Sequence, residues 1–424
     1  RVYILAEDLV ERVFEKEIGD ITVQRAYPGS ELLGLEYEPL FPIYSGDKKI
    51  YYTIHGNFVS TAEGTGIVHI APAFGEDDHQ AGQQHDLPTL QPVDLKGNFT
   101  EEFPPFAGVF VKDADQSIIK QLRENGRLFS VDMYTHEYPF CWRCSTPLLY
   151  YAKAAWFLRT TAIKDDIIAN NNKINWYPSF MGSGRFGDFL ENLIDWALSR
   201  DRYWGTPLNI WKCEKCGRVE AIGSRQELVE HAVNSNLART VEFHKPYIDA
   251  VLLVCPACRG EMKRVPEVID CWFDSGAMHT AQWHYPFENQ DIFFKEKFPA
   301  DFICEGQDQT RGWFYSLLVL STLVYNQPAY RNVVGTGLGL DAEGRKMSKS
   351  LGNMIDPWDL VEEFGADVVR WYYAWATSPW NSMILSKENF REILNKFMGT
   401  LRNVVYFFVI YGNIAEFDPR KIHG

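Results

Sequence analysis

The hydrophobic and polar pattern changes along the chain. Residues 1 to about 135 are rich in Val, Ile, Tyr and Phe between turn residues, which predicts a mostly β domain with a few short helices. Between about 266 and 385, apolar strand-like runs alternate with helical ones, which predicts an α/β domain with a parallel sheet. From about 386 the pattern is helical and amphipathic. The short helices of the first domain are expected at about 6–16, 76–86 and 114–126.

The middle of the chain separates these regions. Phe186 to Arg200 has apolar residues at helical spacing and acidic residues on the opposite face, which predicts an amphipathic helix. A chain of 424 residues is too long for one ordinary domain. The boundaries are expected at 1–135, 136–204, 205–265, 266–385 and 386–424.

A short polar segment, Gly344 to Asn353, reads GRKMSKSLGN and follows Val333 to Leu340, which reads as a buried strand. Lys346 and Lys349 lie three residues apart between glycines that allow the loop to move. Two ammonium groups in this setting suit a polyphosphate whose charge grows as a bond to phosphorus breaks. From spacing alone, a solvated surface loop is an equally good interpretation.

Cysteine spacing adds a metal hypothesis. Six of the eight cysteines form Cys-x-x-Cys pairs, and the chain has no secretory signal pattern, so zinc is favoured over disulfides. Two pairs within 205–265 offer four thiolates, which suits a closed, structural zinc site. The pair at Cys141 and Cys144 is half of such a site, or two buried thiols. Cys271 and Cys304 are expected to be buried as small hydrophobic residues. The four ligands in 205–265 are Cys213, Cys216, Cys255 and Cys258.

Charge narrows the class of partner. The chain has 42 basic and 56 acidic residues, a formal charge of −14, so it is not a general nucleic-acid-binding protein, and an RNA partner needs local basic patches. No apolar run is judged long enough to span a membrane, so an intracellular, cytoplasmic protein is expected. The sequence begins at Arg1 in the middle of a strand-like pattern, which suggests a piece of a longer protein.

Another polar cluster lies in Glu63 to Gln80, EGTGIVHIAPAFGEDDHQ. Ile67 to Ile70 is expected to be a buried strand that carries His69, and Asp77 and Asp78 are expected to open the next helix. Carboxylates in a first helical turn complement the helix dipole, and a histidine in a strand is commonly a core residue. The residues alone therefore leave a structural role open for both.

Three strings together resemble a known family. Lys-Met-Ser-Lys-Ser at 346–350 resembles the ATP-binding signature of the class I aminoacyl-tRNA synthetases. The strings EGQDQTRGWF at 305–314 and SRDRYWGTP at 199–207 resemble the isoleucyl-tRNA synthetases in particular. The resemblance implies the C-terminal half of a Rossmann-like nucleotide-binding domain, with an inserted editing domain, a zinc ribbon and the start of a helical anticodon-binding domain.

The resemblance also implies site residues. Lys346 and Lys349 would stabilise the phosphates of ATP, bound with Mg²⁺, in the transition state. The substrates would be isoleucine, ATP and tRNA(Ile), and the enzyme would be a monomer. The residues that would contact ATP or the adenylate are Glu305, Gly306, Asp308, Ser348 and Lys349. Those that would frame the amino-acid pocket are Trp272, Gln309 and Trp313.

The Glu63 to Gln80 string is similar to the editing domain of isoleucyl and valyl synthetases. By that likeness Asp78 would hold the α-ammonium of a misattached amino acid and His69 would line the pocket. The family's threonine-rich peptide, its His-x-Gly-His motif and the partners of Cys141 and Cys144 are not in this sequence. Little activation or editing is therefore expected from this polypeptide by itself.

Three alternatives remain at this stage. A valyl-tRNA synthetase is a close alternative, but the SRDRYWG run at 199–205 and the DQTRGW run at 308–313 argue against it. A zinc-ribbon protein that binds nucleic acid without catalysis would explain the cysteines but not the lysine loop. A free-standing deacylase could be built from residues 1–135 alone.

Overall fold

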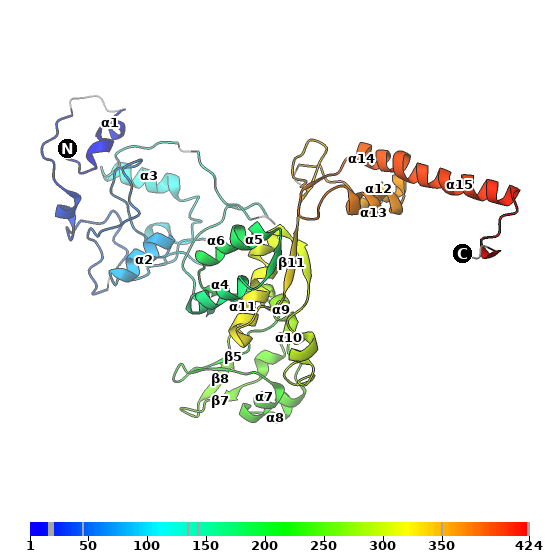
Figure 1. Ribbon diagram of the computed structural model, residues 1–424. Coiled ribbons are helices and arrows are strands. Elements are labelled where there is room, and N and C mark those ends of the chain that lie inside the picture. Colours follow the sequence, from blue (N-terminus) through cyan, green and yellow to red (C-terminus); the bar gives the residue numbers. More distant parts are fainter. Residues whose placement is uncertain (16–20, 45, 134, 142–143, 349–350, 422–424) are drawn as a thin grey trace. The chain divides into compact units, whose positions relative to one another are not determined.

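The computed structural model describes residues 1–15, 21–44, 46–133, 135–141, 144–348 and 351–421. The chain forms two compact units, Arg1–Ala154 and Ala155–Gly424 (Figure 1). Each unit has its own buried clusters and is described by itself below.

The first unit contains short helices joined by long irregular segments. The predicted helices at 76–86 and 114–126 are confirmed by α2 and α3, and short helical turns fall within the predicted 6–16 segment. These elements are η1 (Glu7–Leu9), α1 (Val10–Val13), η2 (Gly29–Leu32), α2 (Glu76–Gln84), η3 (Pro104–Phe106) and α3 (Asp115–Glu124).

The expected β content of this unit is not found. Among its described residues there is no strand, and pairing is limited to isolated bridges such as Glu36 to Tyr52 and Val93 to Phe99. Its aromatic residues instead form a compact cluster, in which Phe103 and Phe106 are buried against Phe99. Aromatic and β-branched residues favour strands only where a pleated neighbour covers them, so composition alone overpredicted the sheet.

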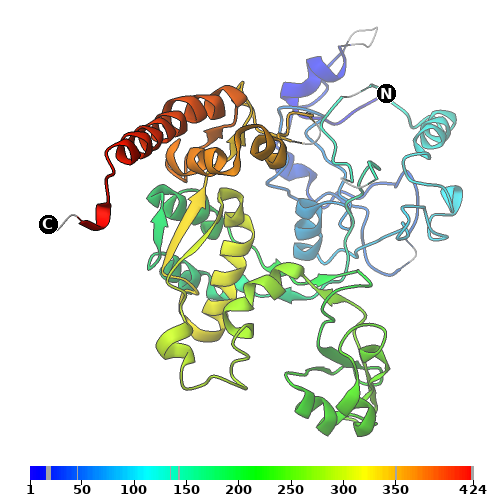
Figure 2. The same cartoon turned by 90° about the vertical axis from the view of Figure 1, so that its right-hand side faces the viewer.

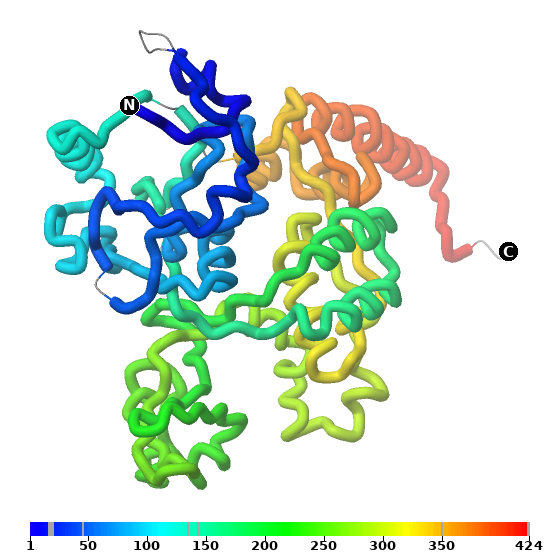
Figure 3. Tube along the Cα trace, turned by 90° about the vertical axis from the view of Figure 1, so that its left-hand side faces the viewer, coloured from blue at the N-terminus to red at the C-terminus, as the bar shows by residue number. Residues whose placement is uncertain are grey.

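The second unit is organised around a parallel three-stranded sheet, as the sequence predicted for an α/β domain. Its order is β10 (Ile303–Gly306), β11 (Asn332–Thr336) and β2 (Asn175–Tyr177). Segments far apart in sequence lie side by side here, because β2, in the green part of the chain, pairs with β11, in the yellow part (Figures 2 and 3). The helices that share one apolar cluster with the sheet include η4 (Thr160–Ile163), α4 (Lys164–Asn171), α5 (Ser179–Ser183), α6 (Arg185–Glu191) and α11 (Trp313–Tyr325).

Helix α11 contributes several side chains to the apolar cluster that also contains residues of this sheet. It is apolar around its whole circumference, as expected for a fully buried helix. Leu317, Leu318 and Phe314 are buried together with Val333 of β11. The Tyr330 hydroxyl donates to the carbonyl of Phe314 at 3.0 Å, so the polar end of this buried ring is satisfied.

The predicted helix from Phe186 to Arg200 is only half correct. Helix α6 ends at Glu191, and two short strands follow it. Strand β3 (Trp196–Ala197) pairs antiparallel with β1 (Phe157–Leu158), and β4 (Ser199–Arg200) pairs antiparallel with β9 (Val268–Ile269). Strand partners distant in sequence outweigh the local helical pattern, which a single sequence cannot reveal.

Residues 210–264 form a four-stranded antiparallel sheet with its own core. The strand order is β6 (Val219–Ala221), β5 (Ile210–Cys213), β8 (Glu261–Arg264) and β7 (Leu253–Val254). Trp211, Leu228 and Met262 are buried at its centre. The helices of this part are α7 (Arg225–His231), α8 (Ser235–Thr240) and η5 (Ile248–Ala250).

The last part of the chain is helical, as predicted from about 386. Strand β12 (Gly339–Leu340) pairs in parallel with β13 (Met383–Ile384), and Leu360, Tyr372 and Phe390 are buried between the helices around it. These helices are α12 (Pro357–Phe364), α13 (Ala366–Trp375), α14 (Lys387–Glu392), η8 (Ile393–Met398), α15 (Gly399–Ile414) and η9 (Pro419–Lys421). The remaining elements of the unit are α9 (Cys271–Gly276), α10 (Met278–Ala281), η6 (Phe293–Lys297) and η7 (Gln307–Arg311).

The helical run Lys387–Ile414 corrects one expectation. It has 28 residues and contains an 18-residue window with a mean hydropathy of 1.2, which is long and apolar enough to cross a membrane, and only 6% of that window is buried. One such helix is weak evidence for a span, because length and composition do not separate it from a helix covered by other protein. The run therefore presents an apolar surface and does not by itself define its environment.

Candidate functional site

The carboxyl edge of the parallel sheet carries the first group of predicted site residues. Glu305 and Gly306 end β10, and they lie opposite Gly335 and Thr336 of β11. Ligands bind at this edge in open parallel sheets. A side chain at Gly306 would place its Cβ 2.5 Å from Oδ1 of Asp308, so glycine lets this carboxylate lie against the backbone. Glu305 and Asp308 are both exposed and so accessible to a ligand.

The predicted pocket residues are brought together beside this edge. Oε1 of Gln309 accepts from the backbone N–H of Trp313 at 2.9 Å, while Nε2 of Gln309 donates to Oδ2 of Asp308 at 3.1 Å. A Cβ at Gly312 would lie 3.2 Å from Cη2 of Trp272, so that indole edge is beside the Trp313 backbone. Trp272, Gln309 and Trp313 therefore form one cluster.

Helix α9 is held tightly against α11 at this cluster. The indole N–H of Trp313 donates to the carbonyl of Ser275 at 3.0 Å. A Cβ at Gly276 would come within 2.8 Å of backbone and side-chain atoms of Ser316, so only glycine permits the two helices to approach so closely. The rings are thus fixed by backbone contacts, and Trp272 remains 40% exposed on its open side.

Asp341 is buried, and its hydrogen bonds join the two ends of the lysine loop. Its Oδ1 accepts from the backbone N–H groups of Arg345 at 2.7 Å and Glu343 at 3.1 Å. Its Oδ2 accepts from Nε of Arg345 and from Nδ2 of Asn353, both at 2.8 Å. The Asn353 amide, with the Arg345 amide and guanidinium, holds the pKa of Asp341 below its usual range. The first and last turns of the loop are therefore tied together.

Asn353 also fixes the middle of the loop. Its Oδ1 accepts from the backbone N–H of Ser348 at 2.9 Å, and its Nδ2 lies 3.3 Å from the carbonyl of Lys346. Met347, between these two residues, packs against the helical cluster that contains Leu360. Lys346 is exposed, and Lys349 lies outside the described residues. The loop directly follows β12, which pairs with β13 in a separate two-stranded sheet, and β11 is the strand before β12 in the chain.

The four cysteines of residues 205–265 are brought together as predicted. Their sulfur atoms all lie within 4.8 Å of one another, with Cys213 and Cys258 3.5 Å apart and Cys216 and Cys255 3.7 Å apart. Four sulfurs placed tetrahedrally about 2.3 Å from a zinc ion would be roughly 3.8 Å apart. Amide hydrogen bonds from Cys216 and Lys215 lower the pKa of Cys213 to about 6. At Cys258 the effect of the Gly260 amide is outweighed by the neighbouring thiols of Cys213 and Cys216, which raise its pKa to about 12, so the fit to zinc rests on the sulfur positions. This donor set fits zinc.

The other cysteines differ from the predictions. Cys141 is half-buried and Cys144 is exposed, and within the described chain no third metal-ligating side chain joins them. Hydrogen bonds from Thr146 lower the pKa of Cys144 to about 7. The expected burial of Cys271 and Cys304 is wrong, since both are exposed. Cys271 begins a short helix and Cys304 lies on an edge strand, where apolar neighbours in sequence do not produce burial.

In the first unit, His69 and Asp78 lie near each other. Asp78 is in the first turn of α2, as predicted, and its pKa is raised by partial burial, against the effects of the Ala71 amide and of His69. A Cβ at Gly75 would lie 2.3 Å from Oδ2 of Asp78, so glycine makes room for this carboxylate. The predicted buried strand is wrong, because Ile67 is 45% exposed and His69 lies on an irregular segment.

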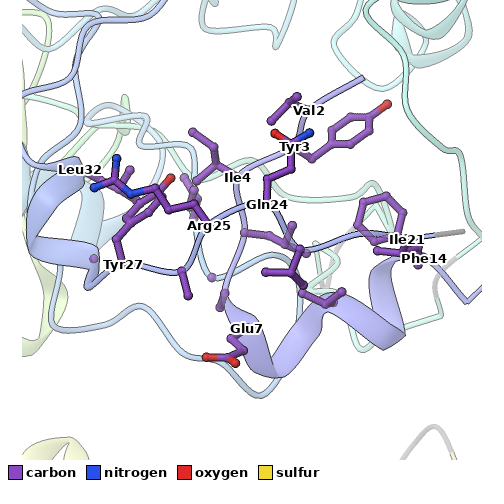
Figure 4. A pocket seen from close by; sticks show the side chains of 18 of the residues that line it. Val2, Tyr3, Ile4, Glu7, Phe14, Ile21, Gln24, Arg25, Tyr27 and Leu32 are labelled. Atoms are coloured by element: carbon purple, nitrogen blue, oxygen red, sulfur yellow. The ribbon is translucent and has the colours of Figure 1, made fainter.

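A cavity in the same unit was not anticipated. It has a volume of about 700 Å³ and is lined largely by apolar side chains near the start of the chain, among them Tyr3, Ile4 and Phe14 (Figure 4). Ile67 reaches it, but His69 and Asp78 do not line it. The cavity and the two predicted editing residues are therefore separate features of this unit.

Most of the chain is similar to a known protein family. Residues 14–386 match the family described as tRNA synthetases class I (I, L, M and V). The chain therefore belongs to the class I tRNA synthetase family.

Particular relatives are much closer. The chain is 51% identical over 416 residues to an isoleucine–tRNA ligase of Clostridium novyi, covering 98% of this chain and 39% of that protein. It is 50% identical over 401 residues to the isoleucine–tRNA ligase of Clostridium acetobutylicum, covering 95% and 38%. The corresponding protein of Bacillus thuringiensis is 48% identical over 422 residues, covering 100% and 40%. The chain thus spans about two fifths of the length of these relatives.

Proposed function

We propose that this chain acts within a longer polypeptide that ligates isoleucine to tRNA(Ile) through an isoleucyl-adenylate. The observation that carries the proposal is the cluster of Trp272, Gln309 and Trp313 beside the carboxyl end of β10. An apolar pocket lined by indole faces and oriented by a few hydrogen bonds suits a branched aliphatic side chain. The similarity to isoleucine–tRNA ligases supports the same reading.

In the first step the carboxylate of isoleucine attacks the α-phosphorus of ATP. A new bond from carboxylate oxygen to phosphorus forms, and the bond to pyrophosphate breaks. Lys346 and Lys349 neutralise the charge that grows on the departing pyrophosphate, while Glu305 and Asp308 contact the adenylate. Mg²⁺ bound with ATP supplies further positive charge to the phosphates. A ribose hydroxyl of tRNA then attacks the carbonyl carbon and AMP leaves.

The test is amino-acid-dependent exchange between ATP and pyrophosphate by the full-length protein. Isoleucine should support exchange about 10 to 200 times more efficiently than valine, because one methylene in an apolar pocket contributes about 1–3 kcal/mol; isoleucyl-tRNA synthetases are themselves the established example of this limit. Faster exchange with valine would identify a valyl enzyme. RNA binding without exchange would favour a non-catalytic zinc-ribbon protein. The 424-residue chain, a useful comparison, should show little exchange.

We also infer that Asp78 takes part in hydrolytic editing of valine attached to tRNA. Its carboxylate is half-buried beside His69, and a carboxylate is the natural partner for the α-ammonium of an aminoacyl group. Once the ester is positioned, hydrolysis needs mainly a well-placed water. The limited discrimination of the apolar pocket gives such a second site its purpose.

Replacing Asp78 with alanine in the full-length enzyme should slow deacylation of valyl-tRNA(Ile) by about tenfold or more, because the ammonium loses its partner. Isoleucine-dependent exchange should be unchanged. Asp77→Ala is the matched control, since Asp77 is exposed in the same helical turn. Equal deacylation rates in the two variants would exclude the proposed role of Asp78.

We further propose a structural Zn²⁺ on Cys213, Cys216, Cys255 and Cys258. Cys141 and Cys144 would bind a second zinc only with ligands supplied by other segments. A cytoplasmic monomer without a membrane partner fits the function, with the apolar side of the Lys387–Ile414 run covered by further protein. The start of the helical anticodon-binding region belongs to the same proposal.

A further inference from the structure

A buried carboxylate lies directly behind the amino-acid pocket. Asp270 is only 4% exposed, and it precedes α9. Its Oδ2 accepts from Nη2 of Arg200 at 2.7 Å and from the indole N–H of Trp196 at 3.1 Å, while its Oδ1 accepts from the backbone N–H of Trp272 at 3.2 Å. One side chain thus joins β3, β4 and the first turn of α9.

Arg200 is itself held in place by the backbone. Its Nη1 donates to the carbonyls of Ala197 at 2.7 Å and Ser199 at 3.0 Å, while its Nη2 faces Asp270. The backbone N–H of Asp270 donates to the carbonyl of Leu198 at 2.8 Å. These contacts hold the carboxylate in place, because two of its donors come from strands β3 and β4 and the third from the first turn of α9. A buried charge with all its donors in place is rigid, and the loss of one donor is costly.

The pocket depends on this carboxylate through α9. Trp272 is in the first turn of the helix, and the carbonyl of Ser275 accepts from the indole N–H of Trp313. A shift at the start of α9 would therefore move one pocket indole directly and disturb the hydrogen bond that orients the other. Gly276 packs directly against Ser316, so there is no free space between α9 and α11 into which the helix could shift.

We propose that Asp270, with Arg200 as its partner, is a positioning residue that sets the spacing of the two pocket indoles and so tunes the choice of amino-acid side chain. The inference rests on the proposed function of this site. Asp270 is buried behind the pocket and acts on the substrate through Trp272 and Trp313. An aspartate is required because an amide at this position has one oxygen, whereas the three donors approach both carboxylate oxygens.

The test measures the KM of the full-length enzyme for isoleucine and for ATP by exchange. Asp270→Asn should raise the KM for isoleucine about tenfold and reduce the preference for isoleucine over valine, with the KM for ATP changed less than about twofold. Arg200→Lys keeps the positive charge but loses the guanidinium, whose Nη1 and Nη2 donate to different acceptors. This variant should raise the KM for isoleucine by about threefold. The second variant keeps the test decisive if the first does not fold.

Asp249→Asn is the matched control, because Asp249 forms a similar ion pair with Arg264 at 2.6 Å, in the cysteine-containing sheet. It should leave both KM values unchanged. The proposal is overturned if Asp270→Asn and Arg200→Lys keep the wild-type KM for isoleucine, or if they change the KM values for isoleucine and ATP equally. If the wild-type enzyme shows no isoleucine-dependent exchange, the proposed function fails first, so the two failures are distinguishable.

Discussion

Replacing Lys346 or Lys349 with alanine is expected to slow isoleucine-dependent exchange between ATP and pyrophosphate by about 100-fold or more in the full-length enzyme. Each ammonium would stabilise charge that appears on pyrophosphate only as the bond to the α-phosphorus breaks, and removing one such donor typically costs about 10²–10³ in rate. The KM for isoleucine should change little, because the proposed amino-acid pocket consists of other residues. Exchange kinetics with varied ATP and varied isoleucine measure both quantities.

The hydrogen bonds that shape the described part of the loop do not use the side chain of Lys346. Asn353 holds the carbonyl of Lys346 and the amide of Ser348 through backbone atoms, so alanine at 346 removes the ammonium without removing that support. Lys396→Ala is a suitable control, since this exposed lysine pairs only with Glu392 on its own helical run among the interactions found. Wild-type exchange rates in both lysine-loop variants would take these lysines out of the mechanism.

The parts of the site that the sequence predicted are those fixed by local chemistry. The Cys-x-x-Cys turns, the lysine loop after a buried strand and the polar end of β10 each need only a few adjacent residues to define them. Asn353 is the last residue of the lysine loop. The sequence does not reveal that its side chain donates to Asp341, because the spacing of the two residues does not indicate this contact.

The failures share a physical cause, which is contact between distant segments. Strand β4 forms because Val268 and Ile269 lie beside it, and this overrides the helical pattern that runs through Arg200. Asp270 gains its importance from Arg200 and Trp196, which lie about seventy residues earlier. In the first unit, aromatic and β-branched residues form an apolar cluster but no strands among the described residues. Strand formation also requires a partner strand, which a single sequence does not reveal.

Removal of metal from the four-cysteine site is expected to unfold the sheet around it. Cys213 and Cys255 are 2% and 0% exposed and belong to the same buried cluster as Trp211 and Met262, so without a cation this small core loses the group that joins its four sulfur atoms. Binding of structural zinc contributes about 10–16 kcal/mol in small zinc domains, and this is folding free energy. The purified chain should contain about one zinc ion per molecule by elemental analysis.

Cys255→Ser should lower the zinc content below about half an equivalent, because a closed site needs all four ligands, and it should expose this sheet to proteolysis. Cys271→Ser is the matched control, since that cysteine is exposed and outside the cluster, and it should keep both zinc and protease resistance. A chelator should reproduce the effect of Cys255→Ser on the wild-type chain. Protease resistance that survives complete loss of metal would mean that the apolar cluster alone sustains the sheet.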